Sequence, residues 1–229
     1  MGITRECFVH YATLIGNGII DFSKCRVMEL GAQTVHFQDM DFMQRFAETS
    51  GFPISTVNGF TADMPGKEMH ERFGHEYYCI DQDDLNGRVS VLDWDLNECS
   101  CPVSHRGLYD LVTNYGTTEH LINQTNAFRL MHDLTRPWGA MVHVLPMARM
   151  NHGFFNYNPV FFQSLARYNG YKQVGLYLSR DLDYRALQDL VPFAGRIPAG
   201  MEYVHSILIK TSDAPFVNPS QIFSNGRMS

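Results

Sequence analysis

The fold is decided by residues 26–33, RVMELGAQ, near the start of the chain. The first part of this stretch is a short, mainly apolar run that ends at Gly31, which is typical of a buried strand followed by a tight turn. Glu29 and Gln33 place polar groups on either side of the glycine. Because parallel sheets bind ligands beyond the carboxyl ends of their strands, the stretch predicts a ligand site at Gly31.

Outward from this stretch, short β-rich runs alternate with helical patterns along the chain. Further strands are predicted at 76–81, 88–93, 109–114, 140–145, 171–178 and 201–210. Helices are predicted at 5–20, 38–49, 65–73, 118–135 and 159–169, with a weaker one after Asp183 that includes Leu187, Leu190 and Val191. The alternation predicts an α/β fold, a seven-stranded and mostly parallel sheet with helices on both faces and the last strand antiparallel. We expect residues 1–25 to form an N-terminal helical segment, a candidate lid, and residues 26–229 to form one α/β domain.

Composition and charge narrow the class of protein. Of the 229 residues, 45% are hydrophobic and 13% aromatic, which is enough for a sizeable core and excludes disorder of the whole chain. The 18 Lys and Arg against 24 Asp and Glu give a net charge of −6 without any basic block, so a small substrate is favoured over nucleic acid. No apolar run approaches the roughly 18 residues of a membrane span, so no membrane partner is expected. An odd number of cysteines and no secretion signal predict reduced thiols and a cytoplasmic location.

Polar and acidic residues follow four consecutive predicted strands. They occupy 29–34, 81–84, 93–95 and 114–120. Because the carboxyl ends of parallel strands meet at one edge of a sheet, we expect these groups to gather in one site. A purely structural sheet has no need of them there.

These groups suit the parts of a nucleoside ligand. Gly31 lets the backbone approach a ligand without a Cβ in the way. A carboxylate at Asp81 can accept hydrogen bonds from both hydroxyls of a ribose. Either Asp93 or Asp95 can accept from the exocyclic amine of adenine, with Trp94 beside the ring. The sequence therefore predicts that a nucleoside lies across the ends of these strands.

Taken in order, these segments resemble the class I S-adenosylmethionine-dependent methyltransferases. The passage 133–144, DLTRPWGAMVHV, is similar to the family's passage from a helix into its fifth strand, and the resemblance covers residues 24–210. The chain departs from the family at the loop, where Gln33 and Val35 replace later glycines. The resemblance implies a Rossmann-like methyltransferase fold, S-adenosylmethionine as cofactor and S-adenosylhomocysteine as product. The cofactor-binding residues that it implies are Glu29, Gly31, Ala32, Gln33, Asp81, Gln82, Asp93, Trp94, Asp95, Asn114 and Tyr115.

Methyl transfer from a sulfonium asks mainly for positioning of the acceptor and sometimes for a base. The resemblance implies that acceptors enter after the strand at 109–114, where His120 lies, and His152 follows the strand at 140–145. These two histidines are the predicted catalytic residues, whereas His143 within a strand is more typical of a core. A small-molecule or carrier-held acceptor is expected to contact Tyr11, Glu119, Asn156 and Tyr157.

Several alternatives stay open. The same fold could use S-adenosylmethionine to transfer or cyclise its aminocarboxypropyl arm, or the chain could be a non-catalytic partner subunit. Glu119 could simply favour a helix start, and His152 could lie in a turn. Glu119-His120 also resembles the end of a Glu-x-x-Glu-His pattern that binds magnesium in some methyltransferases of small RNAs. Gly116 stands in the place of the first acid, so the pattern is incomplete and no metal is predicted. A divalent ion near Glu119 and His120 stays an open alternative, and the oligomeric state is also open.

Overall fold

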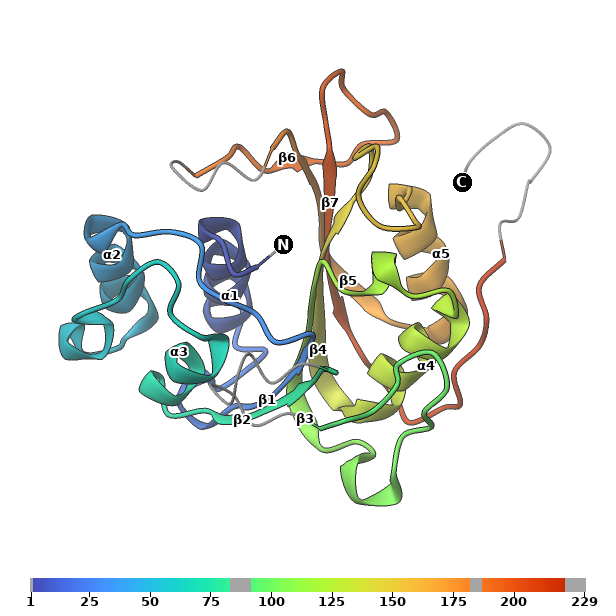
Figure 1. The fold of residues 1–229 in the computed structure, drawn as a ribbon, viewed down its shortest axis with the longest axis horizontal. Helices are drawn as coiled ribbons and strands as arrows, with labels where there is room; N and C mark the ends of the chain where they lie inside the picture. Colours follow the sequence, from blue (N-terminus) through green and yellow to red (C-terminus); the bar gives the residue numbers. More distant parts are fainter. Residues whose placement is uncertain (1, 83–91, 182–186, 221–229) are drawn as a thin grey trace.

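A computed structural model describes residues 2–82, 92–181 and 187–220 of the chain. Its centre is a 7-stranded sheet in the order β2-β1-β3-β4-β7-β5-β6 (Figure 1). The strands are β1 (Arg26–Leu30), β2 (Glu76–Ile80), β3 (Tyr109–Tyr115), β4 (Thr135–Pro146), β5 (Lys172–Ser179), β6 (Val191–Pro192) and β7 (Tyr203–Ile209). Strands β1 to β4 are parallel, and β7 lies antiparallel between β4 and β5. Seven strands in an α/β sheet, mostly parallel and with the last strand antiparallel, confirm the predicted fold class.

One predicted strand falls largely outside the described residues. Of the stretch 88–93, residues 88–91 are not described, and Leu92 forms an isolated parallel bridge with Ile80 at the end of β2. The seventh strand of the sheet is instead β6, a two-residue pairing in which Val191 lies opposite Leu178. The weaker helix predicted after Asp183 is therefore wrong for Val191, which pairs with β5, and residues 187–190 are not helical.

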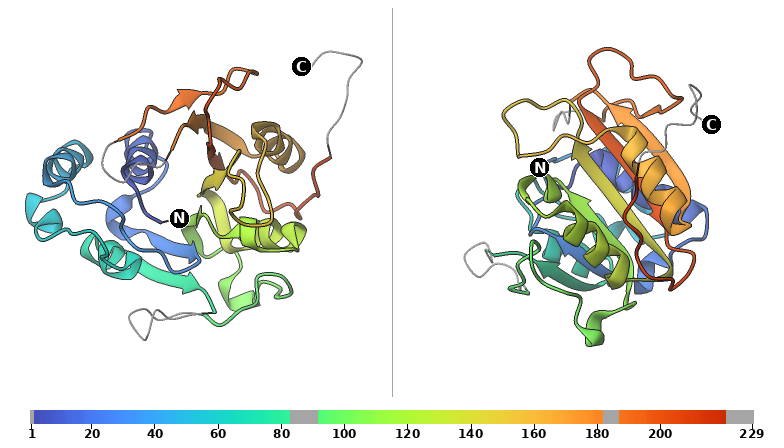
Figure 2. Two further views of the ribbon diagram at one scale, coloured as in Figure 1. Left: turned by 45° about the horizontal axis from the view of Figure 1, so that its top comes forward. Right: turned by 90° about the vertical axis from the view of Figure 1, so that its right-hand side faces the viewer.

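Helices cover both faces of the sheet (Figure 2). One face carries α1 (Arg5–Gly16), α2 (Met40–Ser50) and α3 (Gly66–Arg72), and the other carries α4 (Gln124–Leu134) and α5 (Pro159–Asn169). Side chains alternate between the two layers, because Val27 packs with the first group of helices while Met28 and Leu30 pack with the second. Short 3-10 turns lie at Phe22–Lys24 (η1), Ile54–Val57 (η2), Val103–His105 (η3) and Thr118–His120 (η4).

Helix α4 starts later than predicted. The expected helix at 118–135 begins only at Gln124, because the Asn123 side chain accepts a hydrogen bond from the Asn126 N–H and caps it. Thr118–His120 forms the separate turn η4, so Glu119 does not lie in the first turn of α4. The start of α5 is as predicted, with Asn158 accepting from the Val160 N–H.

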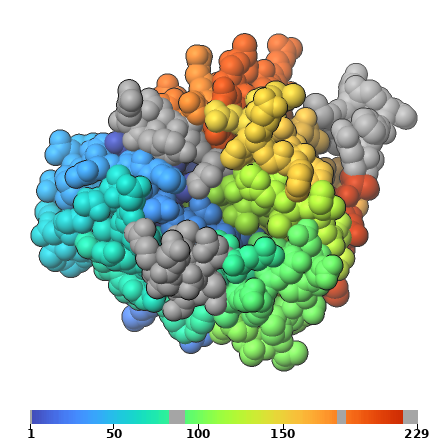
Figure 3. All heavy atoms as spheres, viewed as in Figure 1, coloured from blue at the N-terminus to red at the C-terminus, as the bar shows by residue number. Residues whose placement is uncertain are grey.

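The N-terminal helix shares the core of the first helical layer. Phe8 and Tyr11 of α1 are fully buried and pack with residues of α2, α3 and the sheet. The division of the chain at residue 25, and a lid role for α1, stay predictions. Figure 3 shows the N-terminal helices on one side of the molecule and the middle of the chain on the other. Within the described residues, no helix is both long and apolar enough to cross a membrane.

The strand order reverses beside β1. The chain runs from β1 outward to β2 and then returns to the opposite side of β1 as β3. In open α/β sheets, ligands bind at such a switch point, beyond the carboxyl ends of the strands. The topology therefore locates a candidate site next to Leu30, Ile80 and Tyr115.

Candidate functional site

A cavity of about 400 Å³ lies beyond the carboxyl ends of β1, β2 and β3. Its wall contains these residues of the predicted cofactor set: Gly31, Ala32, Gln33, Asp81, Gln82, Trp94 and Asp95. Of the two predicted catalytic histidines, His120 lines it. The structure thus brings most of the predicted cofactor residues to a single cavity at the switch point of the sheet.

The loop after β1 requires glycine at its first position. Gly31 has φ +74°, and a Cβ there would collide with the hydroxyl of Thr117. The Gly31 N–H donates to the Ile80 carbonyl at 2.8 Å, and the Thr117 hydroxyl donates to the Leu30 carbonyl at 2.6 Å. The Gln33 side chain donates to the Gly31 carbonyl at 3.1 Å. Hydrogen bonds from the neighbouring strand and from the loop after β3 therefore fix the backbone that borders the cavity.

Glu29 holds this loop from behind. The side chain is fully buried, and its Oε2 accepts from the Tyr77 hydroxyl at 2.7 Å and from the Gln33 N–H at 3.0 Å. Its Oε1 lies 3.9 Å from Nε2 of His70 and makes no hydrogen bond to the described residues. Burial raises the pKa of Glu29 to about 7. Glu29 does not line the cavity, so its contact is with the loop that does.

Asp81 and Trp94 form the side of the cavity nearest β2. The Asp81 carboxylate accepts from the Ala32 N–H at 2.6 Å and from the Gln82 N–H at 2.7 Å. A carboxylate has about four lone-pair sites, so hydroxyl groups of a ligand can bind to the same oxygens. The Trp94 ring is held edge-on by His105 at a centroid distance of 5.0 Å.

Other predicted site residues lie away from the cavity wall. Asp93 is exposed beside it. The Asn114 side chain donates to the Thr118 hydroxyl at 2.9 Å, within the layer of α4 and α5. The Tyr115 hydroxyl donates to that of Tyr11 at 3.0 Å on the opposite face of the sheet, and both rings are fully buried. Since neighbouring residues of a strand face opposite ways, Asn114 and Tyr115 cannot both face one site.

A second group of predicted residues lies beside the cavity. Oε1 of Glu119 is 3.4 Å from Nε2 of His152 and 4.0 Å from Nε2 of His120. The two imidazole rings meet edge to face at 5.2 Å. Burial raises the pKa of Glu119 to about 7 and lowers the pKa of both histidines. The structure therefore brings together the two predicted catalytic histidines and one predicted acceptor contact.

The remaining predicted acceptor contacts are not in this group. Asn156 is exposed, and its side-chain oxygen accepts from the Arg149 N–H at 2.8 Å. Tyr157 is buried, with its hydroxyl 2.9 Å from that of Thr118. His143 is also buried, in agreement with a core position.

Some lining residues were not predicted as site residues. They are Ile80, Leu96, Asn97, Thr117 and Leu121. Thr117 directly follows the positive-φ residue Gly116, and this turn after β3 is the signal that could have identified it. Asn97 reaches the cavity through tertiary contacts, because its side chain accepts from the Asn123 N–H at 3.1 Å.

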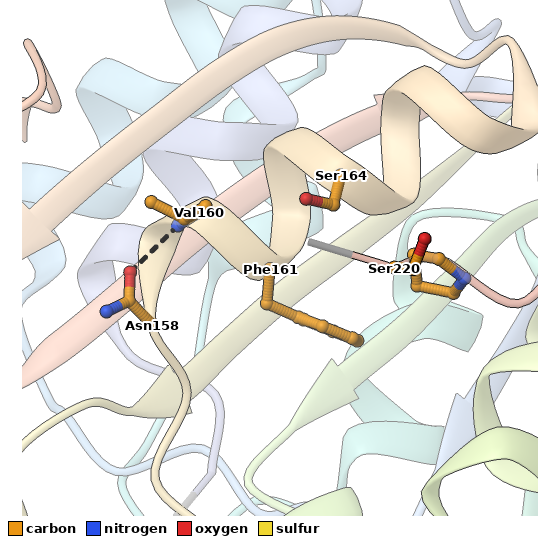
Figure 4. Close-up of a pocket in the computed structure, with 6 residues that line it drawn as sticks. Asn158, Val160, Phe161, Ser164 and Ser220 are labelled. Carbon is orange, nitrogen blue, oxygen red and sulfur yellow. Dashed lines mark hydrogen bonds between the residues drawn. The ribbon is translucent and has the colours of Figure 1, made fainter. Parts of the chain in front are cut away.

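Another cavity, of about 240 Å³, lies between the start of α5 and residues 219–220 (Figure 4). Asn158, Val160, Phe161 and Ser164 line its helical side. The Asn158 oxygen points to the Val160 N–H that it caps, at 3.0 Å. None of the predicted cofactor-binding or catalytic residues lines this second cavity.

Comparison with protein-family models gives no match, and comparison with curated protein sequences gives none either. Among solved structures, the chain is similar to the trans-methyltransferase CalH in complex with S-adenosylhomocysteine, with 11% identity and a TM-score of 0.47. That match covers 87% of this chain and 54% of CalH, so the chain spans about half of CalH's length.

Two further structures have lengths closer to that of this chain. The 1,6-didemethyltoxoflavin-N1-methyltransferase of Burkholderia thailandensis is 14% identical, with a TM-score of 0.45 and coverage of 90% of this chain and 87% of that one. A protein described as a putative sarcosine dimethylglycine methyltransferase, from Galdieria sulphuraria, is 11% identical, with a TM-score of 0.47 and coverage of 90% and 88%. Likeness at this level concerns the fold alone.

Proposed function

We propose that the chain is an S-adenosylmethionine-dependent methyltransferase that acts on a small-molecule or carrier-held acceptor in the cytoplasm. The observation that carries the proposal is the cavity at the switch point, where the Gly31 loop, Asp81 and Trp94 line one wall. These residues supply the close backbone approach, the ribose acceptor and the aromatic surface that a nucleoside with an amino-acid arm requires.

The cavity suits such a ligand in size and in chemistry. Pockets for small molecules and cofactors measure roughly 300–1,000 Å³. Gly31 has no side chain, so its backbone borders the cavity directly. The Asp81 carboxylate lines the cavity and accepts a hydrogen bond from the adjoining loop at Ala32. When bound, S-adenosylmethionine supplies a methyl group already activated by its sulfonium. The residues of the chain are left to orient the cofactor and to present the acceptor.

The acceptor side is formed by η4 and by the loop after β4. His120 is 52% exposed at the cavity, and partial burial lowers its pKa, which favours the neutral imidazole that can orient an acceptor or take its proton. Exposed apolar side chains occur at Ile122, two residues after η4, and at Met150 and Phe154 on the loop after β4. They support an acceptor with an apolar part, and the net charge of −6 supports a small acceptor over nucleic acid. The five cysteines are free thiols, which supports a reducing compartment.

Titration calorimetry with S-adenosylmethionine and S-adenosylhomocysteine tests the cofactor. We expect Asp81→Asn to weaken binding at least about tenfold, because a neutral amide is a poorer acceptor for two ribose hydroxyls. Asp41→Asn is the control and should bind as wild type, since Asp41 is an exposed acid on α2 that does not line the cavity. A folded wild-type chain that binds neither compound would contradict the proposal.

Product analysis then separates the alternatives. S-adenosylhomocysteine formed in the presence of candidate acceptors marks methyl transfer, whereas methylthioadenosine marks transfer or cyclisation of the aminocarboxypropyl arm. Binding without turnover of any acceptor, together with unchanged cellular function of Asp81→Asn, would indicate a non-catalytic subunit.

A further inference from the structure

We propose that Glu119, His120 and His152 bind one divalent transition-metal ion at the rim of the cavity. Each residue offers one ligand atom, and the three atoms lie within 4.8 Å of one another. Metal–ligand bonds of about 2.0–2.2 Å put two ligand atoms on a tetrahedral ion about 3.3 Å apart. The distance of 3.4 Å between Glu119 Oε1 and His152 Nε2 already meets this spacing. A small rotation of the half-exposed His120 would close its 4.0 Å distance.

The carboxylate of Glu119 is the observation that calls for a ligand. The side chain is 0% exposed, and neither of its oxygens has a hydrogen-bond donor in the described part of the chain. Nε2 of His152 is likewise buried and makes no hydrogen bond to the residues that the structure describes. Buried polar groups are nearly always satisfied, and a carboxylate left without a partner is costly. One cation placed between these atoms would satisfy both side chains.

The backbone builds this site without help from a metal. The N–H groups of Phe154 and Phe155 donate to the Glu119 carbonyl at 2.7 and 3.2 Å. Gly153 has φ +69°, and a Cβ there would lie 2.8 Å from Cγ of Glu119. Glycine therefore lets the loop that carries His152 pack directly on Glu119. The two ligand-bearing segments are held together in the arrangement that the ion needs.

The donor set indicates the class of metal. Imidazole nitrogens suit Zn²⁺, Fe²⁺, Co²⁺ and Ni²⁺, whereas Mg²⁺ prefers oxygen ligands and usually keeps several waters. Two histidines and a single carboxylate therefore favour a transition metal over Mg²⁺. Three protein ligands also leave at least one coordination position open, as in catalytic rather than structural sites.

The open position suggests a role, which rests on the proposed function. His120 lines the cavity, so the ion would border the space that we assign to the cofactor and the acceptor. A metal held there would supply a binding position for an oxygen of the acceptor, a hydroxyl or a carboxylate, and so orient it. The histidines would then act as ligands and not as bases, and acceptors with an oxygen donor would be preferred.

Metal titration of the chelator-treated full chain tests the site. We expect Co²⁺ and Zn²⁺ to bind at one ion per chain, Co²⁺ with the visible absorption of mixed nitrogen and oxygen ligation, and Mg²⁺ to bind at least about tenfold more weakly. Glu119→Gln, His120→Asn and His152→Asn should each weaken Co²⁺ binding at least about tenfold. Glu98→Gln, an exposed acid outside the group, is the control and should bind as wild type. The two histidines are partly exposed, so their variants should fold even if Glu119→Gln does not.

The outcomes separate the site from the function. No binding of Co²⁺ or Zn²⁺ by the folded wild type would overturn the site and indicate an ion pair between Glu119 and a protonated histidine. Binding unchanged in all three variants would also overturn it and point to the thiols. Mg²⁺ binding as tight as Co²⁺ binding would overturn the assigned metal class. Because S-adenosylmethionine binding is measured separately, a failed metal site with intact cofactor binding leaves the proposed function standing. Intact metal binding with failed cofactor binding leaves the site standing and removes the proposed function, together with the role of the ion.

Discussion

Two buried glutamates stand on either side of the cavity, and their surroundings differ. Glu29, behind the Gly31 loop, accepts hydrogen bonds from Tyr77 and from the Gln33 backbone. Glu119, beside the two histidines, accepts none from the described residues through its side chain. Burial nevertheless raises the pKa of each to about 7. The same shift in pKa thus occurs in a carboxylate that accepts two hydrogen bonds and in one that accepts none from the described residues.

The comparison shows that a perturbed pKa does not by itself identify a ligand group. The hydrogen bonds around the carboxylate separate the two cases. On the Glu29 side, the chain supplies the donors and uses them to fix a loop. On the Glu119 side, two imidazoles lie 3.4 and 4.0 Å from the carboxylate without a hydrogen bond to it, so a ligand can complete the contacts of all three groups.

We expect the largest effect on stability and on cofactor affinity from Gly31→Ala, which alters the loop that Glu29 fixes. In Gly31→Ala, the new methyl group meets the Thr117 hydroxyl at a positive φ, so the loop must move. We expect a loss of about 3 kcal/mol in the free energy of unfolding and a loss of roughly 100-fold in S-adenosylmethionine affinity. Urea unfolding and titration calorimetry measure the two. Gly18→Ala is the matched control, because Gly18 has a similar φ of +63° but a Cβ there would meet no other atom. It should lower the free energy of unfolding by about 1 kcal/mol and leave S-adenosylmethionine affinity unchanged. Equal effects of the two variants would count against the assigned role of the loop.

The titration of Glu29 should be visible in the pH dependence of stability. Its pKa is raised from 4.5 to about 7, so the folded state holds the proton more tightly than the unfolded state. Stability from this group is present below pH 4.5 and is lost as the pH rises through 7. Glu29→Gln cannot lose it, so the variant's free energy of unfolding relative to wild type should rise by about 3 kcal/mol between pH 4.5 and 8.

Urea unfolding of both proteins across this pH range gives the measurement. The amide oxygen of Gln can still accept from Tyr77, so the comparison isolates the charge. Parallel profiles for the two proteins would show that Glu29 titrates normally in the folded chain.

The smallest effect is expected from Thr117→Val. The substitution keeps the shape of the side chain but removes the hydrogen bond of 2.6 Å to the Leu30 carbonyl. We expect about 1 kcal/mol of destabilisation and roughly a fivefold loss of S-adenosylmethionine affinity. Thr118→Val, one residue along and directed to Asn114 and Tyr157, should cost similar stability without affecting cofactor affinity. A loss of affinity in Thr118→Val alone would reverse the assignment of the two threonines.

The parts of the fold that depend on local signals could be predicted from the sequence. The bounds of β1 follow from an apolar run that stops at a positive-φ glycine, and α5 begins at an Asn-Pro pair. The start of α4 was wrong because Thr117, Thr118 and Asn123 are all acceptable caps, and only tertiary contacts select Asn123. The spacing of Leu187, Leu190 and Val191 fits a helix. Val191 instead belongs to the edge strand β6, which pairs with β5.

For the site, position in the sequence indicated the edge of the sheet but not the direction of each side chain. Gly31, Asp81 and Trp94 reach the cavity because they follow strand ends. Asn114 and Tyr115 also end a strand, but their side chains enter opposite core layers. His152 packs against Glu119 because Gly153 leaves room for it. Glu119 lies too far from both residues in the sequence for a local pattern to reveal this contact.

The position of β7 has a consequence for how the chain is made. Ile209 pairs with Ala140 on one side and with Lys172 on the other, so in the described sheet β4 and β5 are joined through β7. While the ribosome is still translating, β4 has an open edge until Tyr203–Ile209 has emerged. Such an edge invites pairing with other chains, and closing it requires contacts far apart in sequence. Nascent chains that stop before residue 203 should therefore depend on chaperones, and the C-terminal strand should be the step that commits the protein to its native sheet.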